Sequence, residues 1–339
     1  MKKSMGIVLG VLLIGSLFVS CGKKAATTET KVANAQVATQ TAASDETWKP
    51  NGTVSMIVAY KAGSGTDNTA RVLTSYADKY VGQTIIIDNK DGASGSIGWT
   101  TLANAKPDGL TLGFVNLPTY CSNITQKLGK YTVDSIEPIC NHVIETSVVL
   151  VAANSTYNTL QDLIDDAKAN PGKLKASTNG NKASNHIGAQ LLAKSAGFTY
   201  KAIPYGGTAD QLLALRQGEV DFSVAKLADF ASFTKEVKVL GVFDTKRLPE
   251  YPDVPTLGEL GLYKDWYGSA RCIVAPAGTP KADVDFYAQA FKETMEDPAY
   301  VAAAKKAYVT TDYRTPAETK TLIDQQMDFC LNTLGDLFN

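Results

Sequence analysis

The sequence predicts an α/β protein of two lobes, each built on a mixed sheet flanked by helices, with two segments that cross between the lobes. Apolar runs with strand composition alternate with helical patterns along the chain, which favours strands joined by helical crossovers. A strand, a loop of small or polar residues and a helix start follow one another three times, at 54–68, 174–185 and 201–208. The 339 residues, 44% of them hydrophobic, are enough to build two cores.

The elements of the first lobe follow from apolar periodicity and turn signals. Runs of apolar and β-branched residues predict strands, and apolar residues at helical spacing predict helices. Asp91-Gly92 and Asp108-Gly109 mark turns between these elements. In chain order we predict strand 54–60, helix 68–80, strand 84–87, helix 97–104 and strand 110–115.

The second lobe is predicted from the same patterns, and the chain then returns to the first lobe. Pro171 and Gly218 each end a helix, and a proline-rich loop occupies 247–255. We predict strand 148–152, helix 160–169, strand 174–176, helix 185–196, strand 201–203, helix 208–217, strands 220–224, 237–243 and 266–275, and helices 283–295 and 316–334. The crossings near 145–149 and 267–273 form a hinge, with 47–147 plus 271–339 in lobe 1 and 148–270 in lobe 2.

The N-terminus has the pattern of an export signal, 1–21. Lys2 and Lys3 precede a short apolar stretch that ends in small residues before Cys21. This pattern resembles a bacterial lipoprotein signal, which implies an extracytoplasmic protein cleaved before Cys21 and anchored in a membrane by lipid on that cysteine. The alternative is a plain secretory signal with an incidental cysteine. Residues 22–46 lack aromatics and predict a disordered tether.

Composition and motifs exclude several function classes. The net charge of −1 gives no basic field for nucleic acid. With two histidines and no cysteine pair at zinc-ligand spacing, we predict no metal site. Gly63 and Gly65 after a strand are similar to a dinucleotide-binding loop, but Asn68 stands at the third glycine position and the protein is exported, so we predict no cofactor. Export permits a Cys121–Cys140 disulfide, and buried free thiols are the alternative for Cys121, Cys140, Cys272 and Cys330.

The loop after the first strand is the first candidate for ligand binding. N–H groups of a first helical turn and the helix dipole attract anions. Tyr60 flanks this loop and either walls the cleft or packs in the core. The alternative for the loop is a tight turn without ligand contact. The predicted site residues here are the loop and two following N-cap candidates: Ala62, Gly63, Ser64, Gly65, Thr66 and Asp67.

The loops after two later strands repeat this arrangement and predict the facing side of the site. His186 either donates to an anion or bonds nearby loop groups, and Tyr205 either walls the cleft or packs in the core. Lys226 follows a strand and either pairs with a ligand carboxylate or is a solvated surface lysine. Ser177 and Ser184 have no nucleophile-elbow context and no paired base, so we predict no enzyme activity. The predicted residues are Ser177, Thr178, Asn179, Ser184, Asn185, His186, Tyr205, Gly206 and Lys226.

Eight motifs, taken in order, make the sequence similar to a known family over residues 48–339. It resembles the substrate-binding proteins of tripartite tricarboxylate transporters, the Bug family. The motifs are Ala62-Gly63-Ser64-Gly65-Thr66-Asp67 with Arg71, Gly92-Ala93-Ser94-Gly95-Ser96-Ile97-Gly98, Lys106-Pro107-Asp108-Gly109-Leu110-Thr111-Leu112, Ala169-Asn170-Pro171-Gly172-Lys173-Leu174, Asn185-His186, Pro204-Tyr205-Gly206-Gly207, Pro252-Asp253-Val254-Pro255-Thr256 and Pro276-Ala277-Gly278-Thr279-Pro280.

The resemblance implies a type II periplasmic-binding-protein fold that clamps a small organic carboxylate and delivers it to membrane permease subunits. It implies a monomer without cofactor in which Ser177, Thr178, Ser184 and Asn185 hold one carboxylate. The far end of the ligand then meets Gly63 to Thr66. Ser64 and Lys226 depart from the usual family residues, and Lys226 favours a dicarboxylate or tricarboxylate over an amino acid. A sensing subunit of a signalling system and an exported enzyme are the alternatives.

Overall fold

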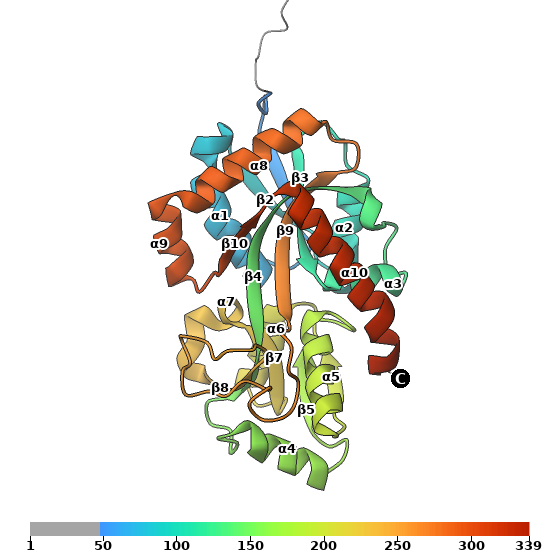
Figure 1. Ribbon diagram of the computed structural model, residues 1–339, viewed down its shortest axis with the longest axis vertical. Coiled ribbons are helices and arrows are strands. Elements are labelled where there is room, and N and C mark those ends of the chain that lie inside the picture. Colours follow the sequence, from blue (N-terminus) through green and yellow to red (C-terminus); the bar gives the residue numbers. More distant parts are fainter. Residues whose placement is uncertain (1–47, 339) are drawn as a thin grey trace, which may run out of the picture. The chain divides into compact units, whose positions relative to one another are not determined.

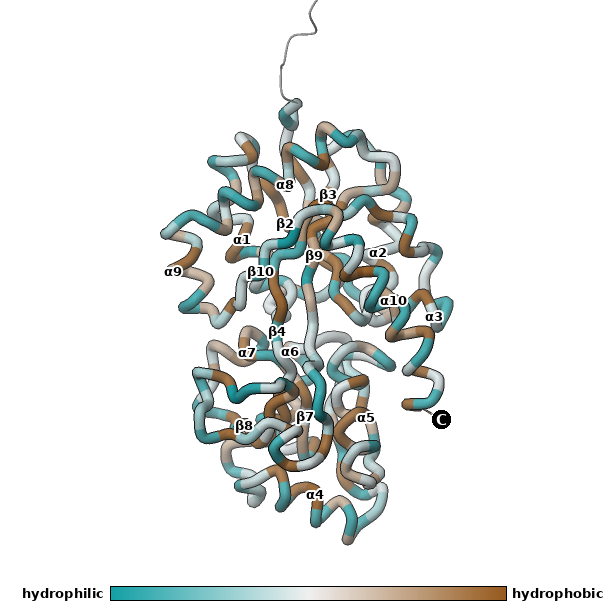
Figure 2. Tube along the Cα trace, viewed as in Figure 1, coloured by the Kyte–Doolittle hydropathy of each residue, from teal (hydrophilic) through white to brown (hydrophobic). Residues whose placement is uncertain are grey.

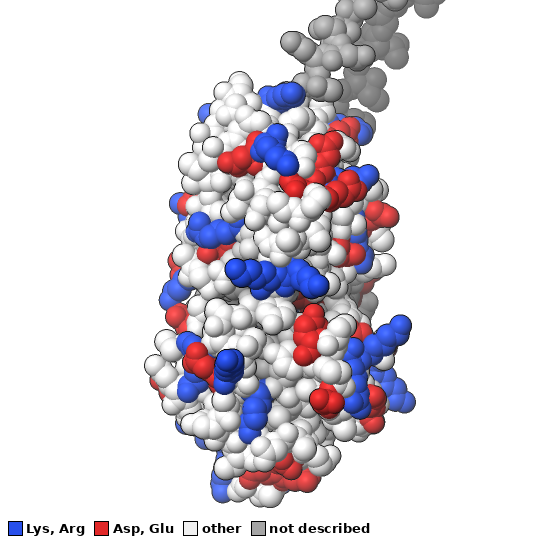
Figure 3. All heavy atoms as spheres, turned by 90° about the vertical axis from the view of Figure 1, so that its left-hand side faces the viewer, with Lys and Arg blue, Asp and Glu red and all other residues white. Residues whose placement is uncertain are grey.

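The computed structural model describes residues 48–338. The predicted export signal 1–21, the lipidation site Cys21 and the tether 22–46 therefore lie outside the described residues. Within residues 48–338, no helix is both long enough and apolar enough to span a bilayer. On the face drawn in Figure 3, basic and acidic side chains are interspersed among uncharged residues, so no single-sign field covers it.

Ten strands within the described residues form one bent mixed sheet whose two halves share β4 (Figure 1). The first half has the order β2-β1-β3-β9-β4, with β10 also on β4, and the second half has the order β4-β7-β5-β6, with β8 also on β4. Residues 136–146 of β4 pair with β9, and residues 147–152 pair with β7 and β8. The strands are β1 Val54–Val58, β2 Ile85–Asn89, β3 Thr111–Leu117, β4 Ile136–Ala152, β5 Lys175–Thr178, β6 Lys201–Pro204, β7 Phe222–Lys226, β8 Val237–Val242, β9 Gly268–Pro276 and β10 Thr311–Arg314.

Helices cover the faces of both halves (Figure 1). The C-terminal helix α10 packs on β4 and contacts both α3 and α5, so it touches elements of the two halves. The helices are α1 Gly65–Val81, α2 Ser96–Ala103, α3 Thr119–Thr125, α4 Leu160–Ala169, α5 Ser184–Ala196, α6 Thr208–Arg216, α7 Leu227–Phe230, α8 Lys281–Glu296, α9 Pro298–Lys306 and α10 Pro316–Phe338, with short 3₁₀ turns at Ala93–Gly95, Val133–Ser135 and Ala231–Glu236.

The predicted α/β class with mixed sheets is confirmed, and several elements differ in detail. Strand β4 starts at Ile136, which is twelve residues before the predicted position 148. Its first part carries Asn141, His142 and Glu145, which break the apolar run that marked the strand. The structure also adds α3, α7, α9 and β10. Pro298 starts α9, where the Asp297 carboxylate accepts from Ala299 N at 2.9 Å.

The predicted N-cap of the first helix is also corrected. Ser64, rather than Thr66 or Asp67, is the N-cap of α1, and its hydroxyl accepts from Asp67 N at 3.3 Å. Helix α5 follows Ala183, which has no capping side chain. Two N–H groups of its first turn donate to other side chains instead. Ser184 N donates to Thr119 Oγ1, and Asn185 N donates to Asn179 Oδ1.

The hydrophobic core follows the inner strands, where Figure 2 concentrates the apolar residues. Met56 and Phe291 belong to a cluster under α1 and α8, and Leu150 and Phe230 belong to a cluster in the second half. The four cysteines within the described residues are buried free thiols, so the structure has no Cys121–Cys140 disulfide.

Candidate functional site

Buried polar residues gather where the two halves of the sheet meet, and contacts cross between the halves there. Ser184 N donates to Thr119 Oγ1 at 2.9 Å, and Ser122 Oγ donates to Lys182 O at 2.7 Å. Buried polar groups are rare without a specific role, so their concentration here marks a candidate site. We name this set the polar layer: Ser64, Thr66, Asn116, Thr119, Glu145, Ser147, Ser177, Thr178, Asn179, Ser184, Asn185, Lys226, Asp229 and Arg271.

Lys226 is the last residue of β7, and its side chain is 2% exposed. Its ammonium donates to Ser184 Oγ at 2.9 Å and to Asn185 Oδ1. Among residues 48–338 it takes part in no ion pair, because the nearby acids pair with Arg271. Burial lowers the pKa of Lys226 to about 8, against the opposing charge of Asp229. The alternative of a solvated surface lysine is therefore excluded.

The loops after β5 hold the partners of Lys226 in a fixed network. Asn179 Oδ1 accepts from Asn185 N at 3.1 Å, and Asn185 Nδ2 donates to Gln211 Oε1 at 2.8 Å. Thr178 Oγ1 donates to Gly180 O at 3.3 Å. The buried hydroxyl of Ser177 has no hydrogen-bond partner within the described part of the chain. Ser177 therefore retains a donor that a buried acceptor can use.

Sequence reasoning missed a hydroxyl on the first crossing. Ser147 on β4 lies directly opposite Lys226 on β7 in the antiparallel register. Directly opposed residues direct their side chains to the same face of a sheet. The Ser147 hydroxyl is buried and, within residues 48–338, has no partner. No sequence signal pointed to it, because Ser147 was expected to precede the strand rather than to lie in it.

The glycine loop after β1 is held from within the first half. The Asp67 carboxylate accepts from Gly63 N, Arg71 Nε and Asn89 Nδ2, each at 2.9 Å. Burial opposes ionisation, but these three donors together hold the pKa of Asp67 below its usual value. Asp67 thus fixes the loop and is a poor base. Thr66 Oγ1 accepts from Asn116 Nδ2 at 2.7 Å, so the end of β3 supports the same loop.

Four buried ionisable groups meet below this loop, and three of them were not predicted. Arg271 on β9 forms an ion pair with Glu145 on β4 and approaches Asp229 on α7, with Nη2 3.5 Å from Oδ1. Arg271 Nη1 also donates to Thr69 Oγ1 at 3.1 Å. Asp229 Oδ2 accepts from Lys226 N at 2.9 Å. We name Glu145, Lys226, Asp229 and Arg271 the charged cluster. Their separation in sequence hid them, since no local motif joins these four positions.

The charged cluster lies against the start of α1. A Cβ atom added to Gly65 would lie 1.7 Å from Asp229 Oδ1, 2.8 Å from its Cγ and 3.2 Å from Arg271 Nη2. Gly65 therefore permits the second half, through Asp229, to reach the first turn of α1. Negative charge at that position is favoured by the helix dipole.

Gly65→Ala is expected to destabilise the protein, because the added methyl displaces the buried Asp229 carboxylate. Overpacking of this kind costs about 1–3 kcal/mol. Urea unfolding followed by circular dichroism measures the loss. Gly52→Ala is the matched control, since nothing lies within 4 Å of its added Cβ. Equal unfolding midpoints for the two variants would show that Gly65 and Asp229 do not approach in solution.

The remaining predicted residues lie outside the polar layer or support it. Tyr60 is 3% exposed and packs edge to face on Trp99, with ring centroids 6.0 Å apart, so it belongs to the core. His186 Nδ1 accepts from Lys182 N at 2.9 Å, and burial together with the Lys182 charge lowers the pKa of His186 to about 4. A neutral histidine bonded to its own loop matches the second of its two predicted roles.

Four predicted residues are not buried in the polar layer. Ala62, Gly63 and Gly206 are exposed. Tyr205 is half-buried, and its hydroxyl donates to Glu219 Oε2 at 3.3 Å. Beside them, Lys61 of the first loop and Asp210 in the first turn of α6 form an exposed ion pair of 2.7 Å. Groups of three or more His, Cys, Asp or Glu arranged to hold a metal do not occur in residues 48–338.

Comparison with known proteins places this geometry in a family. A model of the tripartite tricarboxylate transporter family receptor matches residues 69–330. A Cupriavidus necator relative, the UPF0065 protein in the gbd 5′ region, is 34% identical over 253 residues, which cover 74% of this chain and 77% of the relative.

Two solved structures have the same architecture. The periplasmic binding protein BugD is 27% identical with a TM-score of 0.79, over 85% of this chain and 98% of that one. MatC from Rhodopseudomonas palustris with bound malate is 25% identical with a TM-score of 0.78, over 83% of this chain and 98% of that one. The predicted periplasmic-binding-protein fold is confirmed by these two structures.

Proposed function

The chain belongs to the tripartite tricarboxylate transporter receptor family, and we propose that it captures a small organic carboxylate between two lobes and delivers it to the membrane permease of such a transporter. The relatives with this fold are solute-binding proteins rather than enzymes. We propose that one lobe comprises 47–147 plus 271–339 and the other comprises 148–270. Hinge motion at β4 would open and close them.

The observation that carries this proposal is the buried, unpaired charge of Lys226. A buried ammonium bonded only to neutral oxygen atoms is costly unless an anion completes its shell. The hydroxyls of Ser147 and Ser177 lie in the same polar layer and are unpartnered within residues 48–338. A carboxylate accepts from an ammonium and hydroxyls at once, in charge-assisted hydrogen bonds that are stronger than neutral ones.

Most of the predicted residues then have a role at the ligand. Lys226, Ser177 and Ser184 contact one carboxylate, while Thr178, Asn179 and Asn185 shape the loop that holds it. Ser64, Gly65 and Thr66 face the far end of the ligand from the start of α1. Ala62, Gly63, Tyr205 and Gly206 lie at the exposed rim, where the Lys61–Asp210 pair joins the first loop to α6.

The ligand class follows from the charge of Lys226. A full positive charge favours an anion over a zwitterionic amino acid, whose ammonium it repels. Malate, the dicarboxylate bound to the structural neighbour MatC, fits this preference. We propose a dicarboxylate or a tricarboxylate as the ligand, and a monomer anchored outside the cytoplasm by lipid on Cys21 as the working form.

Thermal unfolding with a ligand panel tests the proposal. The protein is first unfolded and refolded to remove carried-over ligand. It is then melted with mono-, di- and tricarboxylates, amino acids, the diamide of malate, nucleotides and sugars. A ligand that binds only the folded state raises the melting temperature with its concentration. We expect a rise of several degrees with one carboxylate class and none with the diamide. A response to nucleotides or sugars alone, without any carboxylate response, would refute the proposal.

A further inference from the structure

The charged cluster carries no spare charge to offset a doubly charged ligand. Lys226 and Arg271 contribute two positive charges, and Glu145 and Asp229 contribute two negative charges. Three of these side chains are 2% exposed and Glu145 is 3% exposed. A bound dicarboxylate therefore brings the buried site to a net charge of −2. Uncompensated charge in a buried site is strongly unfavourable, and titratable groups respond by changing protonation.

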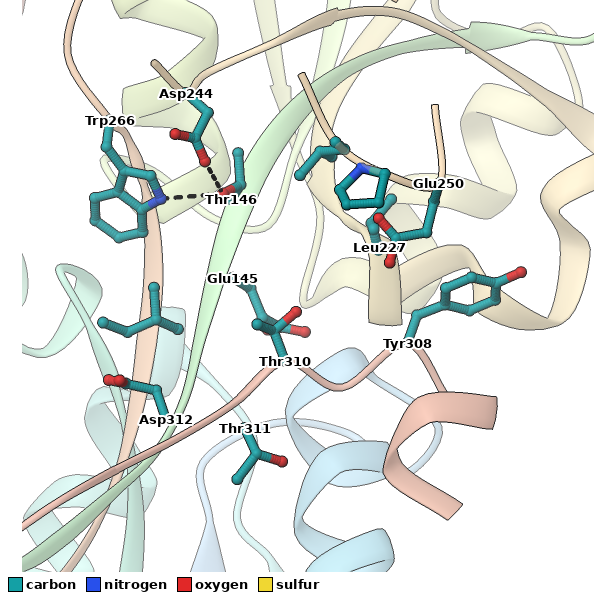
Figure 4. Close-up of a pocket in the computed structure, with 13 residues that line it drawn as sticks. Glu145, Thr146, Leu227, Asp244, Glu250, Trp266, Tyr308, Thr310, Thr311 and Asp312 are labelled. Atoms are coloured by element: carbon teal, nitrogen blue, oxygen red, sulfur yellow. Dashed lines mark hydrogen bonds between the residues drawn. The ribbon is translucent and has the colours of Figure 1, made fainter. Parts of the chain in front are cut away.

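Glu145 is the member of the cluster best placed to accept a proton. Its Oε2 atom forms an ion pair with Arg271, and neither of its carboxylate oxygens has a hydrogen-bond partner within residues 48–338. Glu145 also lines a pocket of about 430 Å³ behind β4. Figure 4 shows its side chain extending from β4 toward the centre of that pocket. The exposed residues Glu250 and Thr310 line the same pocket, so solvent reaches the wall that contains Glu145.

We propose that this protein binds a dicarboxylate together with one proton, which Glu145 Oε1 takes up from the solvent-facing pocket. The inference rests on the proposed function, because it concerns the same ligand. Protonation of Glu145 then determines which net charge on the ligand the site can bind. Protonation of Glu145 changes the net charge of the liganded site from −2 to −1.

The groups that face Glu145 are consistent with this assignment. Burial raises the pKa of Glu145 to about 7, against the lowering effect of Arg271, and Asp229 raises it further. On the pocket side lie three more carboxylates. Asp312 bonds to Arg314 and Asn141, Asp244 accepts from Thr146, and Glu250 is exposed. An incoming dianion adds negative charge on the ligand side, so it drives the pKa of Glu145 upward and protons are taken up.

Lys226 is the other group near the ligand that titrates close to neutrality. Burial lowers the pKa of Lys226, so this group also gains part of a proton when an anion binds beside it. Burial raises the pKa of Glu145, whose oxygens lack hydrogen-bond partners within residues 48–338, so it is expected to take up the larger share. At pH 5.5 both groups are already protonated, and the uptake falls to nearly zero. The dissociation constant then rises by up to about tenfold per pH unit above neutrality.

Isothermal titration calorimetry of the whole protein tests the proposal. Malate and adipate are titrated at pH 7.5 in buffers of different ionisation enthalpy, and the slope of observed enthalpy against buffer enthalpy counts the protons taken up. We expect net proton uptake in the wild type, and an uptake reduced by at least about half in Glu145→Gln. Glu250→Gln is the matched control, since Glu250 lines the same pocket without joining the charged cluster, and it keeps the wild-type uptake.

Every outcome of this titration either supports or overturns the proposed proton uptake. Malate or adipate binding with no proton uptake overturns the proposal and leaves the proposed function intact. Equal uptake in the wild type and Glu145→Gln also overturns it, because another group then takes the proton. If Glu145→Gln fails to fold, loss of the wild-type uptake between pH 7.5 and pH 5.5 supports the proposal, and a constant uptake contradicts it. If no carboxylate binds at all, the proposed function falls and this inference falls with it.

Discussion

Replacing Lys226 by methionine is expected to weaken dicarboxylate binding by at least about thirtyfold. Methionine fills a similar volume but removes the ammonium that the ligand carboxylate needs. Truncating one partner of a buried, hydrogen-bonded charge pair costs about 2–5 kcal/mol of binding free energy, and 2 kcal/mol corresponds to about thirtyfold. Calorimetric titration with malate measures the change.

The same substitution is expected to leave the unliganded protein at least as stable as the wild type. Lys226 has no ion-pair partner within residues 48–338, so the methionine side chain relieves the burial of a charge. The pKa of Lys226 is lowered in the folded state, so the unfolded chain binds more protons and the wild type gains stability as pH rises from about 8. Lys226→Met lacks that gain.

Lys281→Met is the control for this experiment. Lys281 is 85% exposed and pairs with Asp285 one helical turn away. Its loss is expected to change neither affinity nor stability by more than a few tenths of a kcal/mol. Unchanged malate affinity in Lys226→Met would remove Lys226 from the site.

Replacing Arg271 by methionine is expected to destabilise the fold by about 3–5 kcal/mol. Arg271 is the shared partner of Glu145 and Asp229, whose side chains are 3% and 2% exposed. Removing it leaves two buried carboxylates without their ion-pair partner, and breaking a buried pair in this way has a cost of that size. Guanidinium chloride unfolding at pH 7.5 measures the loss.

A second substitution tests whether buried negative charge causes this loss of stability. In the Arg271→Met background, Glu145→Gln removes one of the two buried charges and is expected to restore part of the lost stability. Lowering the pH to 6 is also expected to restore part of the stability of Arg271→Met, because the unpaired Glu145 becomes protonated. A double variant less stable than Arg271→Met at every pH would show that packing, rather than charge, explains the loss.

The sequence was informative where one segment contains the whole feature. The strand at 54–58, its glycine loop and α1 are local, and their order predicted the loop that faces the polar layer. Helix α4 was predicted with its observed bounds, because its pattern is local and Pro171 follows it. The buried thiols and the neutral, loop-bonded His186 each match one of the two predicted alternatives.

The sequence was uninformative where distant segments meet. Glu145, Asp229 and Arg271 come from three elements, and only the fold brings their charges together. The polar part of β4 was missed for a related reason. Its residues Asn141, Glu145 and Ser147 are buried polar groups, and apolar periodicity identifies a strand by a hydrophobic face. The position of Lys226 at the end of β7 was predictable, but its burial depends on Ser184 and Asn185 of α5.

The position of a bound carboxylate tests the central claim most directly. A crystal structure of the refolded protein grown with the carboxylate that raises its melting temperature most would reveal that position. We expect one ligand carboxylate within hydrogen-bonding distance of Lys226 Nζ and the Ser177 hydroxyl, with the other end toward Gly65 and Thr66. A ligand bound elsewhere, such as in the pocket behind β4, or oriented with no carboxylate near Lys226, would contradict the account.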